Sequence, residues 1–257
     1  MTSPVLQVKG LSKTFGALVV ARDIDFALEP GARHALIGPN GAGKTTFVNL
    51  ITGALTPSGG KVLLQGHDIT DLAQADRVKR GIARTFQINT LFLGLTVFDN
   101  LYLAVSERMG ATRDLIRPAG RRRDVVAEAL RFIDMLELES DAGRLVRELP
   151  YGRQRLVEIA IALALEPKVL LLDEPAAGVP SAESHLILDA IAALPEDIAV
   201  LIIEHDMDVV FRFAREITVL VQGGILASGP PDEIAANPEV RSVYLGEGIH
   251  GSGGGHG

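Results

Sequence analysis

Continuous runs of apolar residues in the second half of the chain are bounded by polar segments. Two of them, Val169–Leu172 and Ala199–Ile203, are each followed at once by polar residues. Such runs are typical of parallel strands that are buried on both faces of a sheet. Open sheets of this kind bind their ligands beyond the carboxyl ends of the strands. The pattern therefore predicts an α/β protein whose functional residues follow its strands.

The first part of the chain shows partial alternation of apolar and polar residues. The alternation occurs at Val5–Val8 and at Ile24–Leu28, and Glu29–Gly31 is a turn signal after the second run. A period of two predicts antiparallel strands with one buried face. Residues 5–37 are therefore expected to be rich in antiparallel strands and to end in a buried strand at His34–Ile37.

Helical spacing dominates the middle of the chain, between about 97 and 165. Apolar residues recur three and four positions apart at Val97, Leu101, Ala104 and Val105, at Val126, Leu130, Ile133 and Leu136, and at Leu156, Ile159, Ala160 and Leu163. This spacing places each group on one face of a helix. The basic run Arg121–Arg123 precedes the second helix and is either a solvated helix end or a binding patch.

Shorter segments complete the expected fold. Strands are expected at Lys61–Gln65, after the turn signal Pro57–Gly60, and at Ile82–Phe86, with a short polar helix at Ala73–Arg80. A hairpin is expected at Ile217–Val221 and Ile225–Ala227, around Gly223–Gly224, and a short helix near 238–245. The glycine-rich residues 248–257 predict a flexible tail.

The segment Gly38–Thr45 fits the pattern G-x-x-x-x-G-K-[ST] of a phosphate-binding P-loop. It lies between a predicted strand and a predicted helix over Lys44–Gly53. The alternative, a glycine-rich turn that matches the pattern by chance, would not need this strand–loop–helix context. Its glycines let backbone N–H groups surround a phosphate chain, and a helix N-terminus adds a favourable dipole. Lys44 can reach the β- and γ-phosphates, and the Thr45 hydroxyl can ligate Mg²⁺. The predicted nucleotide-binding residues here are Gly38, Pro39, Asn40, Gly41, Ala42, Gly43, Lys44, Thr45 and Thr46.

Two carboxylates, Asp173 and Glu174, directly follow the apolar run that begins at Val169. An acidic residue at a strand end beside a P-loop is the position of a Walker-B carboxylate, which holds Mg²⁺ directly or through water. Glu174 could polarise the water that attacks the γ-phosphate. The alternative is an acidic pair on the surface without a function. This is disfavoured, because a hydrophobic strand that leads directly into two carboxylates is an unfavourable arrangement for an ordinary surface.

Three further residues have both a functional and an ordinary interpretation. His205 follows the next apolar run and either contacts the γ-phosphate or begins a helix. Gln87 ends the strand of Phe86 and could ligate Mg²⁺ or the attacking water. Phe15 is expected in a short polar loop, either as a platform for an adenine base or as a core aromatic.

Composition narrows the class of protein. The 257 residues include 47% hydrophobic residues, no cysteine and a net charge of −7. The mean hydropathy is +0.25 and the pI is about 5.4. The longest apolar run, Ile159–Leu165, is far too short to span a bilayer, and Met1–Pro4 has no feature of a signal peptide. We therefore expect a cytosolic globular protein without disulfides that is no general nucleic-acid binder.

The motifs together resemble those of the ATP-binding cassette (ABC) ATPases. Gly38–Thr45, Gln87, Leu149–Gln154, Leu172–Pro175 and His205 occur in the order and spacing of that family. The segment Leu149–Gln154 is similar to the family signature at the start of a helix. Tyr151, Glu174–Gly178, Ile203–Met207 and Tyr244–Glu247 resemble more narrowly the nucleotide-binding subunits of branched-chain or hydrophobic amino-acid importers, to which the urea and short-amide importers are related.

This resemblance implies the ABC ATPase fold over residues 1–247: an α/β P-loop NTPase core with an antiparallel β subdomain and an α-helical subdomain inserted at about 88–165. It implies an ATPase with ATP and Mg²⁺, the latter at Thr45, Gln87 and Asp173. It places Glu174, His205 and Gln87 in catalysis, Phe15 against adenine, and Tyr151, Gly152 and Arg153 at a nucleotide.

The resemblance also implies partners and a location. The cassette would form a head-to-tail dimer with a second ATP-binding subunit and would contact membrane-spanning permease subunits through the segment after Gln87. A solute-binding protein would take part indirectly. The chain would lie in the cytoplasm, peripheral on the cytoplasmic face of the inner membrane.

Three positions depart from the family pattern. Pro150 replaces the signature Ser and removes a hydroxyl and an N–H, Arg153 replaces the signature Gln, and Pro180 stands where many members carry Asp. An alternative therefore stays open, a regulatory ATP-binding subunit with slow or no hydrolysis that pairs with a competent paralogue. A soluble P-loop GTPase is disfavoured because the chain lacks an Asn-Lys-x-Asp guanine motif, and a P-loop kinase is disfavoured by the signature-like helix together with Asp173-Glu174-Pro175.

Overall fold

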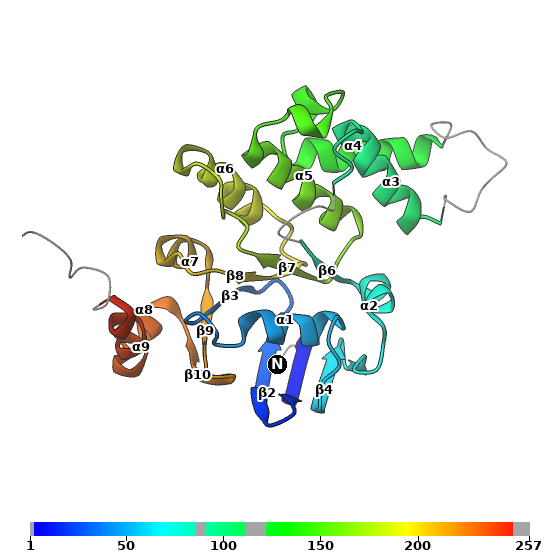
Figure 1. Ribbon diagram of the computed structural model, residues 1–257. Coiled ribbons are helices and arrows are strands. Elements are labelled where there is room, and N and C mark those ends of the chain that lie inside the picture. The colour runs from blue at the N-terminus through cyan, green and yellow to red at the C-terminus, as the bar shows by residue number, and fades with distance from the viewer. Residues whose placement is uncertain (1–2, 86–90, 111–121, 249–257) are drawn as a thin grey trace, which may run out of the picture. The chain divides into compact units, whose positions relative to one another are not determined.

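The computed structural model describes residues 3–85, 91–110 and 122–248. The chain divides into two compact units (Figure 1). The first unit comprises residues 1–72 and 201–257, and the second comprises residues 73–200. The strand β8 (Ala199–Ile203) begins in the second unit and ends in the first.

An antiparallel sheet in the first unit has the strand order β2-β1-β4-β5. Its strands are β1 (Leu6–Phe15), β2 (Leu18–Leu28), β4 (Gly59–Leu64) and β5 (His67–Asp68). Leu6 lies opposite Leu28 on one side and opposite Leu64 on the other, and all three side chains are buried. The alternation in the sequence thus correctly predicted antiparallel strands with one buried face.

The predicted loop around Phe15 is wrong. Phe15 is the last residue of β1 and pairs with Leu18, so that only Gly16 and Ala17 form the turn. The polar residues Lys13 and Thr14 stand in the strand because they bond across it: the Lys13 Nζ donates to the Thr56 carbonyl at 2.7 Å. Cross-strand pairing therefore outweighed the low apolar content of this segment.

The remaining strands of the first unit are β3 (Arg33–Ile37), β9 (Glu216–Val221) and β10 (Gly224–Gly229). They lie in the order β10-β9-β3, and the end of β8 adjoins β3. β3 runs parallel to β9, whereas β9 and β10 form the predicted antiparallel hairpin. The helix α1 (Lys44–Thr52) packs near β2, where the rings of Phe26 and Phe47 meet edge to face at 5.4 Å.

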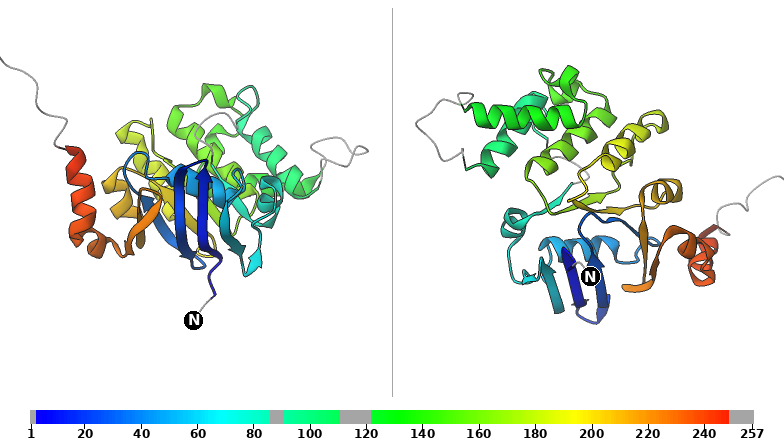
Figure 2. Two further views of the ribbon diagram at one scale, coloured as in Figure 1. Left: turned by 60° about the horizontal axis from the view of Figure 1, so that its bottom comes forward. Right: turned by 180° about the vertical axis from the view of Figure 1, so that it is seen from behind.

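Short helices complete the first unit. α7 (Met207–Phe213) contacts β3, and α8 (Pro231–Ala236) and α9 (Pro238–Gly248) lie beside β10, as both views of Figure 2 show. The sequence predicted α9 but not α8. The segment Pro230-Pro231-Asp232 resembles a turn, yet a proline is well placed at the first position of a helix, where no N–H is needed.

The second unit contains two parallel strands and most of the helices. β6 (Ile82–Arg84) pairs with β7 (Val169–Asp173), and β7 adjoins the start of β8. The helices are α2 (Gln74–Arg80), α3 (Val97–Arg108), α4 (Arg123–Met135), α5 (Tyr151–Ala164) and α6 (Ser181–Ala192), with short 3-10 helices at Glu139–Asp141 and Val146–Glu148. The helical spacing of the middle region correctly predicted α3, α4 and α5, and the structure shows that they pack on one another.

The buried face of α4 differs from the predicted one. Ile133 and Leu136 are buried as expected, but the other buried residues are Val125, Ala129 and Phe132, and Leu130 is 47% exposed. Both sets have helical spacing, so the pattern alone did not decide between them. Burial of Phe132 removes a larger apolar surface from water than burial of Leu130 would, and the Arg131 guanidinium covers this ring at 4.3 Å.

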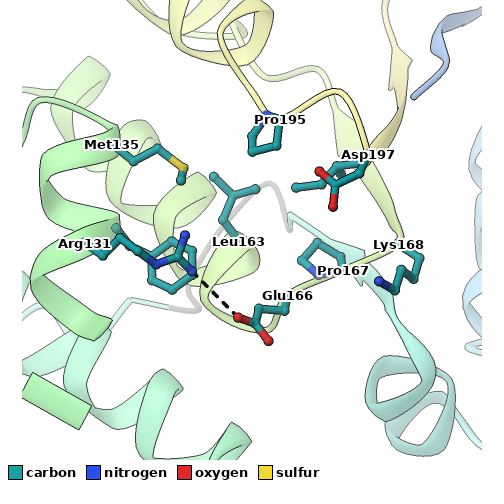
Figure 3. A pocket seen from close by; sticks show the side chains of 10 residues that line it. Arg131, Met135, Leu163, Glu166, Pro167, Lys168, Pro195 and Asp197 are labelled. Carbon is teal, nitrogen blue, oxygen red and sulfur yellow. Dashed lines mark ion pairs between the residues drawn. The ribbon is translucent and has the colours of Figure 1, made fainter. Parts of the chain in front are cut away.

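A cavity of about 320 Å³ lies in the second unit at the amino end of β7 (Figure 3). Leu163 and Met135 form apolar parts of its wall, and Arg131 and Glu166 lie 3.7 Å apart on another side. Asp173 stands at the opposite, carboxyl end of the same strand. The cavity is therefore distinct from the strand end at which the sequence places the chemistry.

One buried histidine makes the stability of the first unit depend on pH. His34 in β3 is 3% exposed, and its Nε2 lies 2.8 Å from the hydroxyl of Thr218, which in turn lies 2.7 Å from that of Ser228. Burial lowers the pKa of His34 from 6.5 to about 4. The neutral ring is therefore the form that the fold holds.

We expect the free energy of unfolding to fall by about 3 kcal/mol between pH 6.5 and pH 4. In this range His34 binds a proton in the unfolded chain but stays largely neutral in the folded protein. Urea unfolding at pH 4, 5, 6 and 7 measures this slope. His34→Gln should flatten it, since the amide does not titrate. His67→Gln, an exposed position in β5, should keep the wild-type slope. Parallel pH curves for wild type and His34→Gln would contradict the assignment.

Candidate functional site

The P-loop connects β3 to α1 in the first unit. α1 begins at Lys44, and its N-cap residue, Gly43, has a φ of 101° and no side-chain cap among the described residues. The first N–H groups of a helix need partners from a cap, water or a ligand. A helix that starts from a glycine loop without such a cap presents these donors to an anion, and its dipole attracts negative charge.

Two glycines of this loop pack against neighbouring backbone. A Cβ at Gly38 would lie 2.2 Å from the carbonyl oxygen of Leu220 in β9, and one at Gly43 would lie 2.8 Å from that of Val20 in β2. A side chain at either position would displace the loop. Gly41 has a φ of 77° and open space beside it, so its glycine serves the backbone conformation instead.

Lys44 is folded back over the loop. Its Nζ donates to the carbonyl of Gly38 at 2.5 Å and to that of Pro39 at 3.1 Å. The ammonium group is thus held above the segment whose N–H groups are predicted to bind phosphates. Thr45 and Thr46 follow in the first turn of α1, with Thr45 exposed.

Two more predicted residues belong to the first unit, and both side chains are exposed. Phe15 is 52% exposed, and the Lys13 ammonium lies 4.9 Å from the centre of its ring. His205 follows β8 with its side chain 67% exposed, while its backbone N–H donates to the buried carboxylate of Glu204 at 3.2 Å. Neither is a core residue, so each ring is accessible to a ligand.

The carboxylates of the predicted Walker-B segment lie in the second unit, where β7 ends. Asp173 accepts a hydrogen bond from the guanidinium of Arg84 at 2.6 Å, and the two side chains are only 14% and 11% exposed. Glu174 has a φ of 46°, a left-handed conformation that costs a residue with a side chain about 1 kcal/mol or more. Such strain at a turn after a strand is typical of functional sites.

The segment with the resemblance to a signature starts α5. Pro150 is the N-cap residue, and Gly152 is buried. Tyr151 is 42% exposed, and its ring lies 3.3 Å from the Cβ position of Gly178, which follows Glu174 in the chain. Arg153 donates through Nε to Asp141 at 2.7 Å and through a terminal nitrogen to the Glu137 carbonyl at 2.6 Å. Arg144 also donates to Asp141, at 2.9 Å, so two guanidinium groups share this carboxylate.

The predicted site residues thus fall into two sets. The first unit holds Phe15, residues 38–46 and His205, and the second holds Tyr151, Gly152, Arg153, Asp173 and Glu174. Gln87 lies outside the described residues. Arg84 was not among the predicted site residues, although one signal was available: it is a basic residue near the end of a predicted strand, where sheets of this kind carry functional residues.

A comparison with models of protein families identifies the class of protein. Residues 21–177 match the ABC transporter family, a stretch that covers more than half of the chain and includes the P-loop, Asp173 and Glu174. The chain belongs to the ABC transporter family. Residues 225–250 of this cassette also match the family described as branched-chain amino acid ATP-binding cassette transporter.

Individual relatives extend over nearly the whole cassette. It is 38% identical over 254 residues to the high-affinity branched-chain amino acid transport ATP-binding protein BraF of Pseudomonas aeruginosa, with 96% of this chain and 100% of that protein covered. It is 37% identical, with the same coverage, to the protein LivG of Escherichia coli K12, which carries the same description. A probable LivG protein of Archaeoglobus fulgidus is 35% identical over 94% of this chain and 95% of its own.

Solved structures confirm the fold. An ATP-binding cassette of an ABC transporter in its ADP conformation has a TM-score of 0.84 and 30% identity, with 95% of this chain and 100% of the other covered. A nucleotide-free cassette from an ABC transporter has a TM-score of 0.82 and 30% identity, with 94% and 99% covered. The predicted ABC ATPase fold is therefore correct. Within the described parts of this cassette, no helix has the length and apolar character needed to cross a membrane.

The oxygen donors of the cassette suit Mg²⁺. Asp173 offers a carboxylate at a strand end and Thr45 a hydroxyl at the start of α1. Mg²⁺ prefers oxygen ligands and takes most of them from water and substrate phosphates. The residues that the structure describes contain no group of three or more acidic or histidine side chains that could hold a metal ion.

Because Gly38 lies so close to the Leu220 carbonyl, adding one methyl group at position 38 should affect both stability and ATP binding. Gly38→Ala should lower the free energy of unfolding by about 3 kcal/mol and abolish ATP binding, because the loop must move away from β9. Gly59→Ala in β4 is the matched control, since open space surrounds its Cβ position. Urea unfolding and equilibrium dialysis with ATP measure both quantities. Similar behaviour of the two variants would refute this role for Gly38.

Proposed function

We propose that this cassette binds and hydrolyses ATP to power an importer of branched-chain or hydrophobic amino acids, or of related small amides. The observation that supports this most directly is the combination of a P-loop with closely packed glycines and whole-chain similarity to branched-chain amino acid transport ATP-binding proteins. Similarity over the complete length matters here, because it includes both the nucleotide motifs and the carboxyl-terminal match at residues 225–250.

The described residues suggest a role for each part of the first unit. Backbone N–H groups of residues 38–46 bind the phosphates. The Lys44 Nζ leaves the loop carbonyls to which it now donates and binds the β- and γ-phosphates instead. The exposed ring of Phe15 stacks on the adenine, and the accessible His205 contacts the γ-phosphate.

The second unit supplies the acidic residues. Mg²⁺, held by Thr45, Asp173 and Gln87, would neutralise charge on the phosphate oxygens. Glu174 orients the attacking water and accepts its proton, and Gln87 assists in placing that water. The strained backbone at Glu174 fits this role, because strain persists where the surroundings impose a particular side-chain direction.

The proposal extends to the assembly. Tyr151, Gly152 and Arg153 at the start of α5 would face the nucleotide of a second ATP-binding subunit, and permease subunits would dock on the segment after Gln87. A solute-binding protein would deliver the solute on the far side of the membrane. The cassette would sit on the cytoplasmic face of the inner membrane. We further propose that residues 1–247 form the cassette, that 88–165 form its helical subdomain, and that 248–257 are a flexible tail.

Glu174→Gln tests the hydrolytic role. The variant should bind ATP but turn it over about a hundredfold or more slowly, because an amide cannot accept the proton of the attacking water. Phosphate release by the purified chain measures turnover, and size-exclusion chromatography in ATP and Mg²⁺ measures dimer formation. The variant should accumulate as an ATP-bound dimer.

Glu196→Gln is the matched control, because Glu196 is an exposed glutamate in the loop before β8. It should retain wild-type turnover and should not accumulate as a dimer. Equal turnover by wild type and Glu174→Gln would exclude Glu174 as the base. ATP binding without turnover by the wild type would instead require a regulatory role or the missing partners.

A further inference from the structure

Arg84 and Asp173 come together because of the register of two parallel strands. Arg84 lies opposite Leu171, and the Thr85 N–H donates to the Leu171 carbonyl at 3.0 Å. Asp173 is two residues beyond Leu171 and so points to the same face of the sheet. An arginine side chain is long enough to reach forward over two strand residues, roughly 7 Å. The pair is thus a direct product of the β6–β7 pairing.

The contact is a strong and largely buried one. The guanidinium nitrogen and the carboxylate oxygen are 2.6 Å apart, which is short even for a charge-assisted hydrogen bond. Both side chains are less than one-sixth exposed, at 11% and 14%, so water screens the pair only weakly. The carboxylate that is proposed to serve Mg²⁺ is therefore already neutralised by a cation of the chain itself.

Two cations cannot make full use of one carboxylate oxygen. A divalent ion that approaches Asp173 is repelled by the guanidinium, and it gains the full charge of the carboxylate only when Arg84 withdraws. We propose that Arg84 is a latch on Asp173: it holds the carboxylate in place without Mg²⁺ and gives up the bond to Oδ2 when Mg²⁺ arrives with ATP. This inference rests on the proposed function. Arg84 acts through Asp173 and is a positioning residue.

The latch has two consequences that oppose each other. Without Mg²⁺ the bond stabilises the second unit, because a buried carboxylate without a partner is costly. With Mg²⁺ the same bond must be broken, which weakens the affinity for the ion. Removal of the guanidinium should therefore lower the thermal stability of the cassette without nucleotide. It should also lower the Mg²⁺ concentration that is needed for nucleotide binding.

Arg84→Gln separates these effects in the full-length chain. The probe is a non-hydrolysable ATP analogue, whose affinity is measured in EDTA and again at rising Mg²⁺ concentrations. We expect half-saturation at a Mg²⁺ concentration about tenfold lower than for the wild type, within the range of coupling between two sites of one protein. The affinity in EDTA should stay within about twofold. Thermal unfolding without nucleotide should occur at a lower temperature.

Arg108→Gln is the matched control. It removes two ion pairs of the same unit, from Arg108 to Glu128 at 3.0 Å and from Arg108 to Glu166, and the Arg108 side chain is 17% exposed. It should lower thermal stability and leave the response to Mg²⁺ unchanged. If Arg84→Gln does not fold, Arg84→Met replaces it, because methionine keeps much of the apolar stem of arginine and removes the positive charge. Its Mg²⁺ half-saturation should fall below that of the wild type.

Each other outcome overturns the latch. An unchanged or weakened response to Mg²⁺ in the Arg84 variant would show that Arg84 does not compete with the ion. A large loss of affinity in EDTA would show that Arg84 binds the nucleotide itself. Failure of the wild type to bind the analogue under either condition would refute the proposed function instead, so the two failures are distinguishable.

Discussion

The close contact between the P-loop and the backbone of neighbouring strands is the constraint on which the first unit depends. Gly38 lies against the Leu220 carbonyl of β9, and Gly43 lies against the Val20 carbonyl of β2. These contacts tie the start of α1 to the parallel sheet and to the antiparallel sheet at once. The loop can therefore present its N–H groups in a fixed arrangement only because no side chain stands at either position, and preorganised donors are the ones that bind a phosphate without a cost in ordering.

Features that depend on local sequence were predictable in this chain. The apolar runs that became β7 and β8, the glycine pattern of the P-loop and the helix after it are set by neighbouring residues, and they stand where the sequence places them. The end of β1 and the buried face of α4 were not predictable in this way. Phe15 is in a strand because of its pairing with Leu18, and Phe132 faces inward because of the helices packed on α4. In both cases a long-range contact decided between local alternatives.

The same distinction applies to the candidate site. The position of residues such as Asp173 and His205 at strand ends was enough to make them candidates, and their roles stay predictions. The ion pair of Asp173 was not predictable in this way, because it joins separate elements: Arg84 and Asp173 are 89 residues apart in the chain. Arg153 shows the consequence. As a charge in the signature segment it suggests a contact with phosphate, but its bonds to the Asp141 carboxylate and the Glu137 carbonyl direct its side chain within the second unit.

The adjacent carboxylates Asp173 and Glu174 illustrate how one strand end can give two acids different tasks. Asp173 is the last residue of β7, where regular strand geometry directs it to the face occupied by Arg84. Glu174 departs from that geometry with a φ of 46°, which turns the chain before its side chain could follow the alternation of the strand. One carboxylate is thereby matched to a cation, and the other is held in a strained turn beside it. The proposed roles make different demands: a base must keep its electron pair for a proton, whereas a metal ligand must give it to a cation. The change of backbone conformation between these two residues is compatible with both proposed roles side by side.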